Sequence, residues 1–538
     1  METSAELAPD YYLTNFYKLI EHATQWYEDL LSSQEHQWLA DFSRLPHSAQ
    51  CLLVRLYSRK GCWFRSDKLN YPEISSIEQA LAKLYQSGFI TLNPCLPIPQ
   101  LANSLLTKAE ILALWPGLPK TQKKDLLIEQ LEHGEFHQFE RLSFKIIRLE
   151  SAQMIDLLLT LFFANTRQDL SQFVLDDLGL QQFENYSLSQ ARRFFDNRSQ
   201  VQHLITLSLL TEQYWQTDRK QKANLDALAG ELTGAVGHHY VDRKREHLIN
   251  DIARDYERLE EWNTALYWFE QTTLTPSRER RARIYDKLDQ NQKFSDVVTG
   301  MLTCPIDDSE LEIAQKLQQR LQRKQGMKIP RTARPEFTTH NLVLDLTQQR
   351  VELAVKSYFE QQGWSVFYTE NTLLNALFGL TLWDAIFAPV EGAFINAYQH
   401  RPLDLYHSDF VNKRSAKIES ALHHLAAGEY HHLYRTYQTK LGLSNPFIQW
   451  AKIEPQLLKL TLDTIPSRLL VALIRTQLRD LKLYRNGMPD LIAFKGNKFE
   501  WIEVKGPGDK LQDNQLRWFK QFQRLNVPFS VCYVEHTV

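Results

Sequence analysis

The sequence has few cysteines and no long apolar run. Its five cysteines are scattered over 538 residues and never form CxxC, which argues against a disulfide framework and against a zinc ribbon. Nowhere are about 18 consecutive apolar residues found, the length of a membrane-spanning helix. The first residues also lack the pattern of a signal peptide. These absences predict a soluble chain in a reducing compartment, without a membrane partner.

The sequence also lacks an excess of either charge. Lys and Arg number 62 and Asp and Glu number 64, so the formal net charge is −2. A polyanion would therefore have to be bound by local basic patches rather than by the field of the whole molecule. With 43% hydrophobic and 23% charged residues, the composition is that of a folded protein long enough for several domains.

The first hundred residues predict a small, mostly helical domain. Apolar residues recur at helical spacing in 49–64, and 75–92 starts at a serine cap and ends in two apolar turns around Gly88. Two helices followed by a short strand pair resemble a winged-helix layout, which we assign to residues 1–100.

A second small module is expected at 101–135. Its stretch 107–131 holds two amphipathic helical segments around a loop, a layout that resembles a SAP-type DNA-binding hairpin. Lys120, Lys123 and Lys124 stand at the start of the second helix and are candidates for DNA contacts. A lysine face that meets only solvent is the alternative.

The segment 140–325 is predicted to be almost wholly helical. Within it, 254–271 and 283–302 echo each other and align Tyr256 with Tyr285. A period of about 30 residues with aromatic residues between helices is typical of tetratricopeptide-like helical hairpins.

Two basic stretches belong to this region. The stretch 277–287 holds four arginines within about two helical turns, enough charge to hold one phosphate group. Arg281 and Arg283 are the candidates for this contact, although a solvated helix face is the commoner outcome. The stretch 323–337 combines five basic residues with two prolines and a glycine, and it predicts a linker that could also touch nucleic acid.

The C-terminal domain, 340–538, carries the strongest chemical pattern. Asp490 precedes the apolar run LIAF, and a Lys-Gly-Asn-Lys turn separates this run from FEWIEVK, which predicts a hairpin of two strands. Because side chains alternate along a strand, Glu503 and Lys505 project from one face and Val504 from the other. A carboxylate and an amine are therefore expected in one pocket.

These residues suit metal-assisted hydrolysis of a phosphodiester. Asp490, Glu503 and the carbonyl oxygen of Val504 are ligands that Mg²⁺ prefers. The cation would lower the pKa of a bound water, and Lys505 could orient that water or stabilise the charge on phosphorus. The order PD, about a dozen residues, then ExK matches the PD-(D/E)xK nuclease motif. The alternative is a surface hairpin whose charges pair with one another.

The surrounding sequence resembles a known family. RNGMPDLIAF through EVKGPGDKLQDNQLRWF is similar to a VRR-NUC domain, and 369–387 with 402–410 resembles the Fanconi-associated nuclease branch. The resemblance implies a mostly helical multidomain chain ending in an α/β, restriction-endonuclease-like nuclease domain. In the family pattern Glu370 joins the metal site. The remaining catalytic positions are matched by Asp490, Glu503 and Lys505. Val504 matches the residue that supplies a carbonyl ligand, and Gln515 matches the glutamine of the following helix.

The resemblance further implies a structure-selective DNA nuclease with Mg²⁺ or Mn²⁺ as its cofactor. Such an enzyme cuts 5′ flaps, trims DNA from 5′ to 3′ and acts in interstrand-crosslink repair, in the cytoplasm on the nucleoid or in a nucleus. Branched or flapped DNA is the expected partner. A four-way junction resolvase and a non-catalytic DNA-binding scaffold remain alternatives. The histidine pairs at 423–424 and 431–432 are interpreted as solvated or packing groups rather than zinc ligands.

Overall fold

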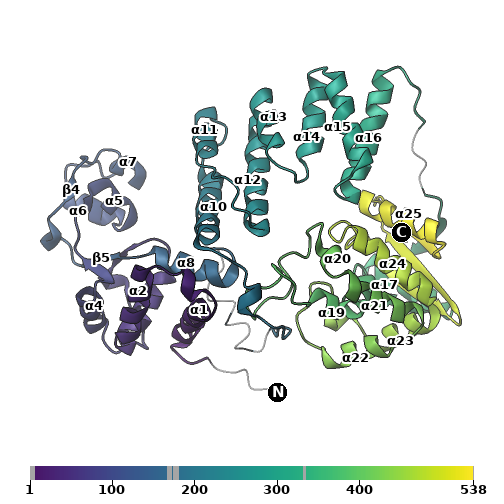
Figure 1. Cartoon of the computed structure of the whole chain (residues 1–538), viewed down its shortest axis with the longest axis horizontal. Helices are drawn as coiled ribbons and strands as arrows, with labels where there is room; N and C mark the ends of the chain where they lie inside the picture. The colour runs from purple at the N-terminus through teal and green to yellow at the C-terminus, as the bar shows by residue number, and fades with distance from the viewer. Residues whose placement is uncertain (1–6, 167–172, 174–177, 179–180, 331–334, 537–538) are drawn as a thin grey trace. The chain divides into compact units, whose positions relative to one another are not determined.

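The computed structural model describes residues 7–166, 173, 178, 181–330 and 335–536 (Figure 1). The chain divides into two units. The first comprises 1–180 and 195–209, and the second comprises 181–194 and 210–538. The boundary falls inside helix α10 (Arg198–Gln216). Each unit is considered by itself.

The first unit begins with a bundle of helices beside a small antiparallel sheet. The sheet has the order β1-β5-β2. Its elements and the helices around it are α1 (Tyr11–Tyr27), α2 (Ser33–Arg44), α3 (His47–Tyr57), β1 (Trp63–Arg65), α4 (Ile77–Gln86), β2 (Ile90–Leu92), β5 (Ile146–Leu149) and α8 (Gln153–Phe163). The Ser76 hydroxyl caps α4 by accepting from the Gln79 N–H, as the sequence predicts. The helices packed beside this small antiparallel sheet confirm the winged-helix layout.

Two details of this module differ from the prediction. The stretch 49–64 is not helical throughout, because its end forms β1. Residues 146–149 lie in the segment predicted as helical, yet they form β5, the middle strand of the sheet. Local periodicity missed β5 because its two partners, β1 and β2, lie more than 50 residues earlier in the chain.

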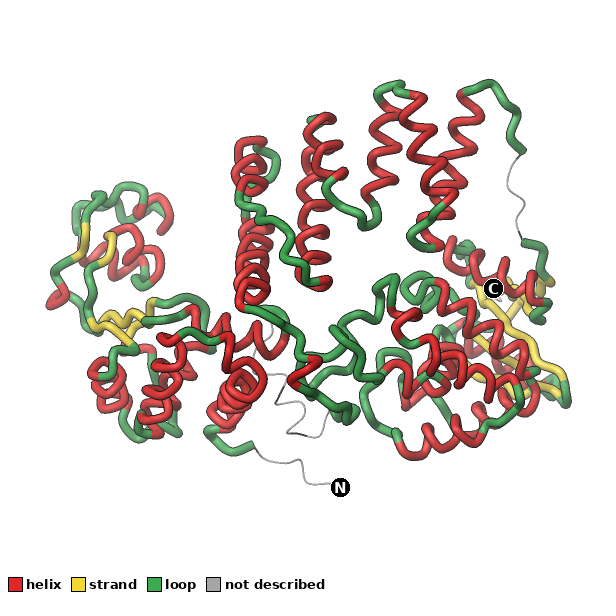
Figure 2. The backbone as a smooth tube through the Cα atoms, in the orientation of Figure 1, coloured by secondary structure: helices red, strands yellow, loops and turns green. Residues whose placement is uncertain are grey.

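The SAP-like module is an insertion between β2 and β5. It consists of β3 (Leu96–Pro97), α5 (Ile98–Ser104), α6 (Lys108–Leu114), α7 (Lys124–Ile128) and β4 (Glu135–Phe136). Its small core includes Leu101, Ile111 and Leu127, none of which is measurably exposed. The strands β3 and β4 pair with each other, so the module starts and ends at one neck, as Figure 2 shows in yellow.

The second unit contains the helical hairpins that the repeat predicts. They comprise α11 (Lys222–Gly230), α12 (His239–Arg258), α13 (Trp262–Glu270), α14 (Ser277–Lys287), α15 (Asn291–Thr303) and α16 (Asp308–Lys324). Tyr256 and Tyr285 are both buried, and their carbonyls accept equivalent hydrogen bonds of 3.0 and 2.9 Å from Glu261 and Gln290. The tetratricopeptide-like fold is therefore confirmed.

The predicted linker at 323–337 is only partly a linker. Arg323 and Lys324 are the last residues of α16, and Lys324 forms ion pairs of 2.6 and 3.2 Å with Asp286 and Asp289. These acids lie more than 30 residues earlier in the sequence, and they bind Lys324 at the end of the helix. Residues 331–334 lie outside the described residues.

A mixed five-stranded sheet forms the core of the C-terminal domain. Its order is β6-β10-β9-β8-β7, with β6 and β9 parallel to β10 and the other pairs antiparallel. The strands and their helices are β6 (Thr338–Leu344), α17 (Val351–Gln361), β7 (Ser365–Tyr368), β8 (Leu491–Lys495), β9 (Lys498–Lys505), α25 (Asp513–Leu525) and β10 (Phe529–His536). The hairpin β8–β9 agrees with the prediction, and the edge strand β6 was not predicted.

A helical insertion separates β7 from β8. Its helices are α18 (Leu373–Thr381), α19 (Trp383–Ile386), α20 (Phe410–Lys413), α21 (Ser415–Ala426), α22 (His431–Thr439), α23 (Pro455–Thr464) and α24 (Ser467–Arg479). Trp383 and Phe387 are buried in its core. His424 pairs with Glu429 at 2.5 Å.

Among the described residues, no helix has the length and apolar character needed to cross a membrane.

Candidate active site

The hairpin β8–β9 sets the acids opposite each other. Leu491 pairs with Ile502, so one step further along this register Asp490 faces Glu503. The turn after Lys495 contains Gly496 at φ = 59°, a backbone conformation that suits glycine and a two-residue hairpin loop. A one-residue slip would move Glu503 to the other face of the sheet. The hairpin register therefore fixes the pairing of the two carboxylates.

Strand alternation places Glu503 and Lys505 side by side, as the sequence predicts. Lys505 Nζ lies 2.8 Å from Glu503 Oε1, and both side chains are buried, with exposed fractions of 8% and 1%. Val504 points to the other face and packs in an apolar cluster with Val355 and Cys532. Its backbone N–H donates to Asp490 Oδ2 at 2.9 Å, which ties the two strands at the site.

Helix α25 brings Gln515 to the same carboxylate. Its side-chain Nε2 donates to Glu503 Oε1, while its Oε1 accepts from the Gln512 N–H at 2.9 Å. This helix end packs closely on the segment before Asp490. A Cβ on Gly487, which has φ = 88°, would lie 2.6 Å from the backbone of Asn514. Only glycine allows this approach, so Gly487 is part of the positioning of Gln515.

Glu370 follows β7, and two backbone contacts hold its segment against the loop of Asp490. The Thr369 N–H donates to the carbonyl oxygen of Asp490 at 2.7 Å, and the Met488 N–H donates to Asn371 Oδ1 at 3.1 Å. The Tyr368 hydroxyl donates to Glu370 Oε2 at 2.5 Å. Glu370 itself is exposed. The acid predicted about 120 residues upstream is therefore adjacent to the hairpin.

Burial and mutual repulsion make the acids reluctant to ionise. Burial raises the pKa of Glu503 to about 8, and the charge of Asp490 adds to this rise while Lys505 opposes it. Burial also raises the pKa of Asp490 to about 6. The hydrogen bond from Val504 lowers this pKa, and the negative charge of Glu370 raises it. One lysine does not balance these carboxylates, so the pocket favours a further positive charge.

The oxygens of Glu503 suit a cation. Lys505 and Gln515 both contact Oε1, whereas Oε2 is buried and has no hydrogen-bond partner among the described residues. A buried carboxylate oxygen without a partner is costly. Hard divalent cations take such oxygens as ligands. Oε2 of Glu503 is therefore suited to a cation, and the full set of Glu503, Asp490, Glu370 and the carbonyl oxygen of Val504 stays a prediction.

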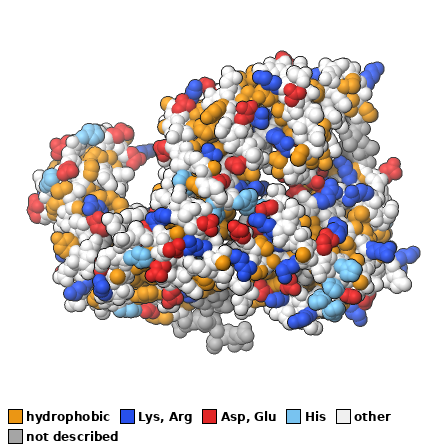
Figure 3. Space-filling view, in the orientation of Figure 1, with side chains coloured by type: hydrophobic (Ala, Val, Ile, Leu, Met, Phe, Trp, Pro, Cys, Tyr) orange, Lys and Arg blue, Asp and Glu red, His pale blue; other side chains and the backbone are white. Residues whose placement is uncertain are grey.

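The predicted DNA-contact lysines lie in the first unit, at the start of α7. Lys120 and Lys123 are exposed. Lys124 is half-buried, and its Nζ donates to the carbonyl oxygen of Asn103 at 2.9 Å. On the face shown in Figure 3, lysines and arginines lie interspersed with acids, as the nearly balanced charge predicts. Local groups such as Lys120 and Lys123 thus remain the candidates for phosphate contacts.

The arginines of α14 have partners within the protein. Arg281 lies 3.0 Å from Glu270, and Arg283 lies 2.7 Å from Glu279. Arg278 and Arg280 are paired with Glu310 and Glu257. A phosphate at Arg281 or Arg283 would have to compete with these acids. Phosphate binding by Arg281 and Arg283 stays a prediction, and this helix face is paired with acids of the protein rather than simply solvated.

Sequence reasoning missed Tyr368 and Asn371, the residues that hold Glu370. Tyr368 is the last residue of β7 and stands two residues before Glu370. Its pKa is raised by burial and by the hydrogen bond to Glu370. Asn371 has φ = 52°, a left-handed conformation that asparagine tolerates better than most residues. This turn gave no signal that periodicity could detect.

Two family profiles match the chain. The profile described as "FAN1, HTH domain" matches residues 10–91, and the profile described as "VRR-NUC domain" matches 428–536. The second range contains Asp490, Glu503, Lys505 and Gln515 but not Glu370. The placement of Glu370 therefore rests on the backbone contacts described above.

Similar proteins extend along the whole chain. A Fanconi-associated nuclease 1 homolog of Pseudomonas aeruginosa is 34% identical over an alignment 551 residues long, which covers 98% of this chain and 96% of that protein. A homolog of Arabidopsis thaliana is 24% identical over 97% of this chain and 67% of its own length. The crystal structure of paFAN1 bound to 2nt 5′ flap DNA with gap superimposes with a TM-score of 0.87 at 32% identity, covering 99% of this chain and 100% of that one.

Identity at this level over nearly the full length of both chains fixes the family. The helix-turn-helix profile, the VRR-NUC profile and the shared fold agree with it. The chain belongs to the Fanconi-associated nuclease 1 family.

Proposed function

We propose that the chain is a metal-dependent DNA phosphodiesterase that cuts 5′ flaps and trims DNA from 5′ to 3′. The observation that carries the proposal is the buried pair Glu503 and Lys505 beside Asp490, with one carboxylate oxygen left without a hydrogen-bond partner among the described residues. The structural relative bound to a 5′ flap supports the choice of substrate. Action in interstrand-crosslink repair belongs to the proposal through the family resemblance.

Each acid has a stated role in this proposal. Asp490, Glu503 and the Val504 carbonyl oxygen would hold Mg²⁺ or Mn²⁺, with Glu370, from the turn after β7, completing the set. When bound, the cation supplies a water of lowered pKa and offsets charge on the phosphate. Tyr368 fixes one oxygen of Glu370 through its 2.5 Å hydrogen bond, so this exposed acid has a defined direction.

Lys505 and Gln515 act on the reacting groups or on the acid that holds them. The Lys505 ammonium, fixed by Glu503, supplies a positive charge in a buried pocket, where it stabilises charge that develops on phosphorus. Gln515 donates to the same Oε1 and so leaves Oε2 of Glu503 as the oxygen that a cation would take. Gln515 is therefore a positioning residue in this scheme.

Contacts outside the site would hold the duplex arms by their phosphates. Lys120 and Lys123 are exposed and are the first candidates, with Lys124 beside them. Arg281 and Arg283 remain candidates of lower rank, because each already pairs with a glutamate. Phosphate contacts position a substrate without reading its sequence, so the shape of the branch would decide selectivity.

A cleavage assay on matched DNA substrates tests the proposal. Labelled 5′-flap, 3′-flap and four-way substrates are incubated with the protein, with Mg²⁺, with Mn²⁺ and with a chelator. We expect cleavage of the 5′ flap with metal only. Preferred cleavage of the four-way substrate would identify a junction resolvase. Binding without cleavage of any substrate would identify a scaffold, and equal cleavage by Asp490→Ala would place the chemistry elsewhere.

A further inference from the structure

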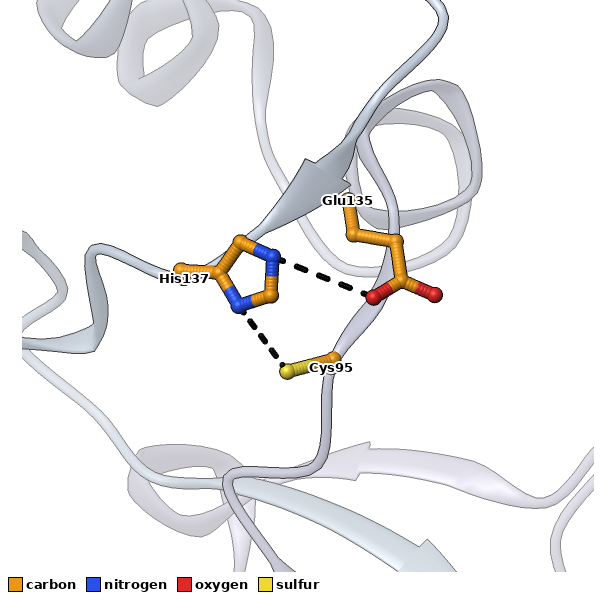
Figure 4. A group of neighbouring side chains, drawn as sticks. All are labelled: Cys95, Glu135 and His137. Carbon is orange, nitrogen blue, oxygen red and sulfur yellow. Dashed lines mark hydrogen bonds and ion pairs between the residues drawn. The ribbon is translucent and has the colours of Figure 1, made fainter.

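A second cluster of potential metal ligands lies far from the nuclease site in sequence, at the neck of the SAP-like module (Figure 4). It consists of Cys95, Glu135 and His137. The register of β3 and β4 pairs Leu96 with Phe136 and Pro97 with Glu135. One step further, Cys95 stands opposite His137, and alternation puts Glu135 on the same face as His137. The backbone itself therefore brings the three side chains together.

The side chains are close enough to share one ion. Cys95 Sγ lies 3.1 Å from His137 Nδ1, and His137 Nε2 lies 3.8 Å from Glu135 Oε2. A tetrahedral zinc ion with bonds of about 2.0 to 2.3 Å separates a sulfur and a nitrogen ligand by roughly 3.5 Å. Figure 4 shows the imidazole between the thiol and the carboxylate. One ligand atom from each of the three exposed side chains lies within 4.8 Å of the other two, so the group can use a single nitrogen of His137.

We propose that Cys95, Glu135 and His137 form a zinc site that clips the neck of the SAP-like module, with water as the fourth ligand. Thiolate, imidazole and carboxylate are all ligands that zinc accepts. Magnesium, in contrast, takes oxygen ligands and has little affinity for a thiolate. The site is therefore chemically distinct from the candidate nuclease site, and neither depends on the other.

A metal ion bound at the neck would stabilise a short strand pairing. The strands β3 and β4 are two residues long, and the further Ile98 N–H to Gly134 carbonyl bond of 2.8 Å is a short continuation of the pairing. The module between them packs in a small core that also includes Phe144 and Ile146, from outside the module. An ion bound across the neck favours the paired state and stabilises the module by mass action.

Spectroscopy with cobalt tests the site directly. Metal-free full-length protein is titrated with Co²⁺ in excess Mg²⁺, which occupies the oxygen-ligand site. We expect one equivalent of Co²⁺ to give a thiolate-to-cobalt charge-transfer band, which Zn²⁺ then abolishes. The band should be absent in Cys95→Ser and weakened in His137→Gln. It should persist in Cys304→Ser and His133→Gln, which change an exposed cysteine and an exposed histidine outside the cluster.

Alkylation gives a second, independent measurement. Zn²⁺ at ten times its dissociation constant leaves about one eleventh of the sites empty, so iodoacetamide should modify Cys95 about tenfold more slowly. Modification of Cys304, read from the same digest by mass spectrometry, should keep its rate. A missing charge-transfer band together with an unchanged rate at Cys95 would overturn the proposal and leave a thiol that only hydrogen-bonds to His137. Flap cleavage is not a readout here, so failure of this site leaves the proposed nuclease function untouched.

Discussion

Two clusters in the second unit both combine acidic and basic side chains, but they differ in how far their charges are paired. In α14, each of the four arginines has a glutamate partner within the protein. At the hairpin β8–β9, Asp490 and Glu503 face each other, and Lys505, bonded to Glu503, is the one basic side chain that pairs with either acid among the described residues. The first cluster is electrically satisfied, and the second has an unbalanced negative charge. An excess of buried charge of one sign, rather than a high density of charge, therefore indicates a candidate functional site.

Removing a charge should therefore have different effects in the two clusters. At the nuclease site it should abolish chemistry and relieve repulsion. In α14 it should leave a buried partner unpaired and cost stability. The expected effects follow in order of decreasing size.

The largest effect is expected for Glu503→Gln on cleavage. The amide keeps the shape of the side chain but removes a charged metal ligand beside Lys505. We expect the rate of 5′-flap cleavage to fall by at least about 10³-fold, roughly 4 kcal/mol in activation free energy, with DNA affinity unchanged. Single-turnover cleavage and a gel-shift titration measure the two quantities. A reduction of less than tenfold would remove Glu503 from the metal set.

The next effect concerns Arg278 and the stability of the helical hairpins. Glu310 is only 3% exposed, and Arg278 lies beside it with a 2.9 Å hydrogen bond from Nε. Arg278→Met leaves that carboxylate without its cation, and we expect the unfolding free energy to fall by about 3 kcal/mol. Urea denaturation of the wild type and the variant measures this change in unfolding free energy.

The matched control for that change is Arg283→Met. Its pair with Glu279 is an exposed i, i+4 contact, and such pairs contribute less than about 0.5 kcal/mol. Equal destabilisation of the two variants would contradict the view that burial decides the outcome.

Metal should stabilise the wild type and not Glu503→Gln. With Mg²⁺ or Mn²⁺ at ten times its dissociation constant, binding to the folded state adds about 1.4 kcal/mol to the unfolding free energy. The buried Oε2 of Glu503 is the atom that has no other partner among the described residues. Denaturation with and without a chelator measures the difference, and equal stabilisation of both proteins would place the cation elsewhere.

The pH dependence without metal gives a further test. The pKa of Glu503 is raised to about 8 in the folded state, so the folded chain binds the proton more tightly than the unfolded chain, whose carboxyl titrates near 4.5. The stabilisation is present below the unfolded value and is lost as pH rises through 8. Relative to Glu503→Gln, the metal-free wild type should become more stable by up to about 1.4 kcal/mol per pH unit on acidification from 8. A flat difference between pH 6 and 9 would refute the raised pKa.

The smallest effect is expected for the arginines of α14 on DNA binding. Removing one phosphate-binding side chain makes the slope of log affinity against log salt shallower by about 0.9. Because Arg281 and Arg283 already pair with glutamates, we expect Arg281→Ala with Arg283→Ala to change this slope by less than Lys120→Ala with Lys123→Ala does. The reverse order would move the DNA-binding surface to α14.

The local pattern of the sequence predicted most of the C-terminal domain. Period-two alternation gave β8 and β9 and put Glu503 and Lys505 on one face, and helical spacing gave α25 with Gln515. It could not give β6, an edge strand paired with β10 nearly 200 residues later in the chain. It also missed β5, whose partners lie on the far side of the inserted SAP-like module.

What the sequence by itself determined is the chemistry available: two acids and a lysine at a fixed spacing, and an arginine-rich helix. Only the tertiary structure decided which of these charges have partners. Glu257, Glu270, Glu279 and Glu310 neutralise α14, whereas Thr369 and Asn371 bring Glu370 beside an already crowded Asp490. The reason is physical: the energy of a charge depends on its burial and its neighbours, and both are properties of the folded chain.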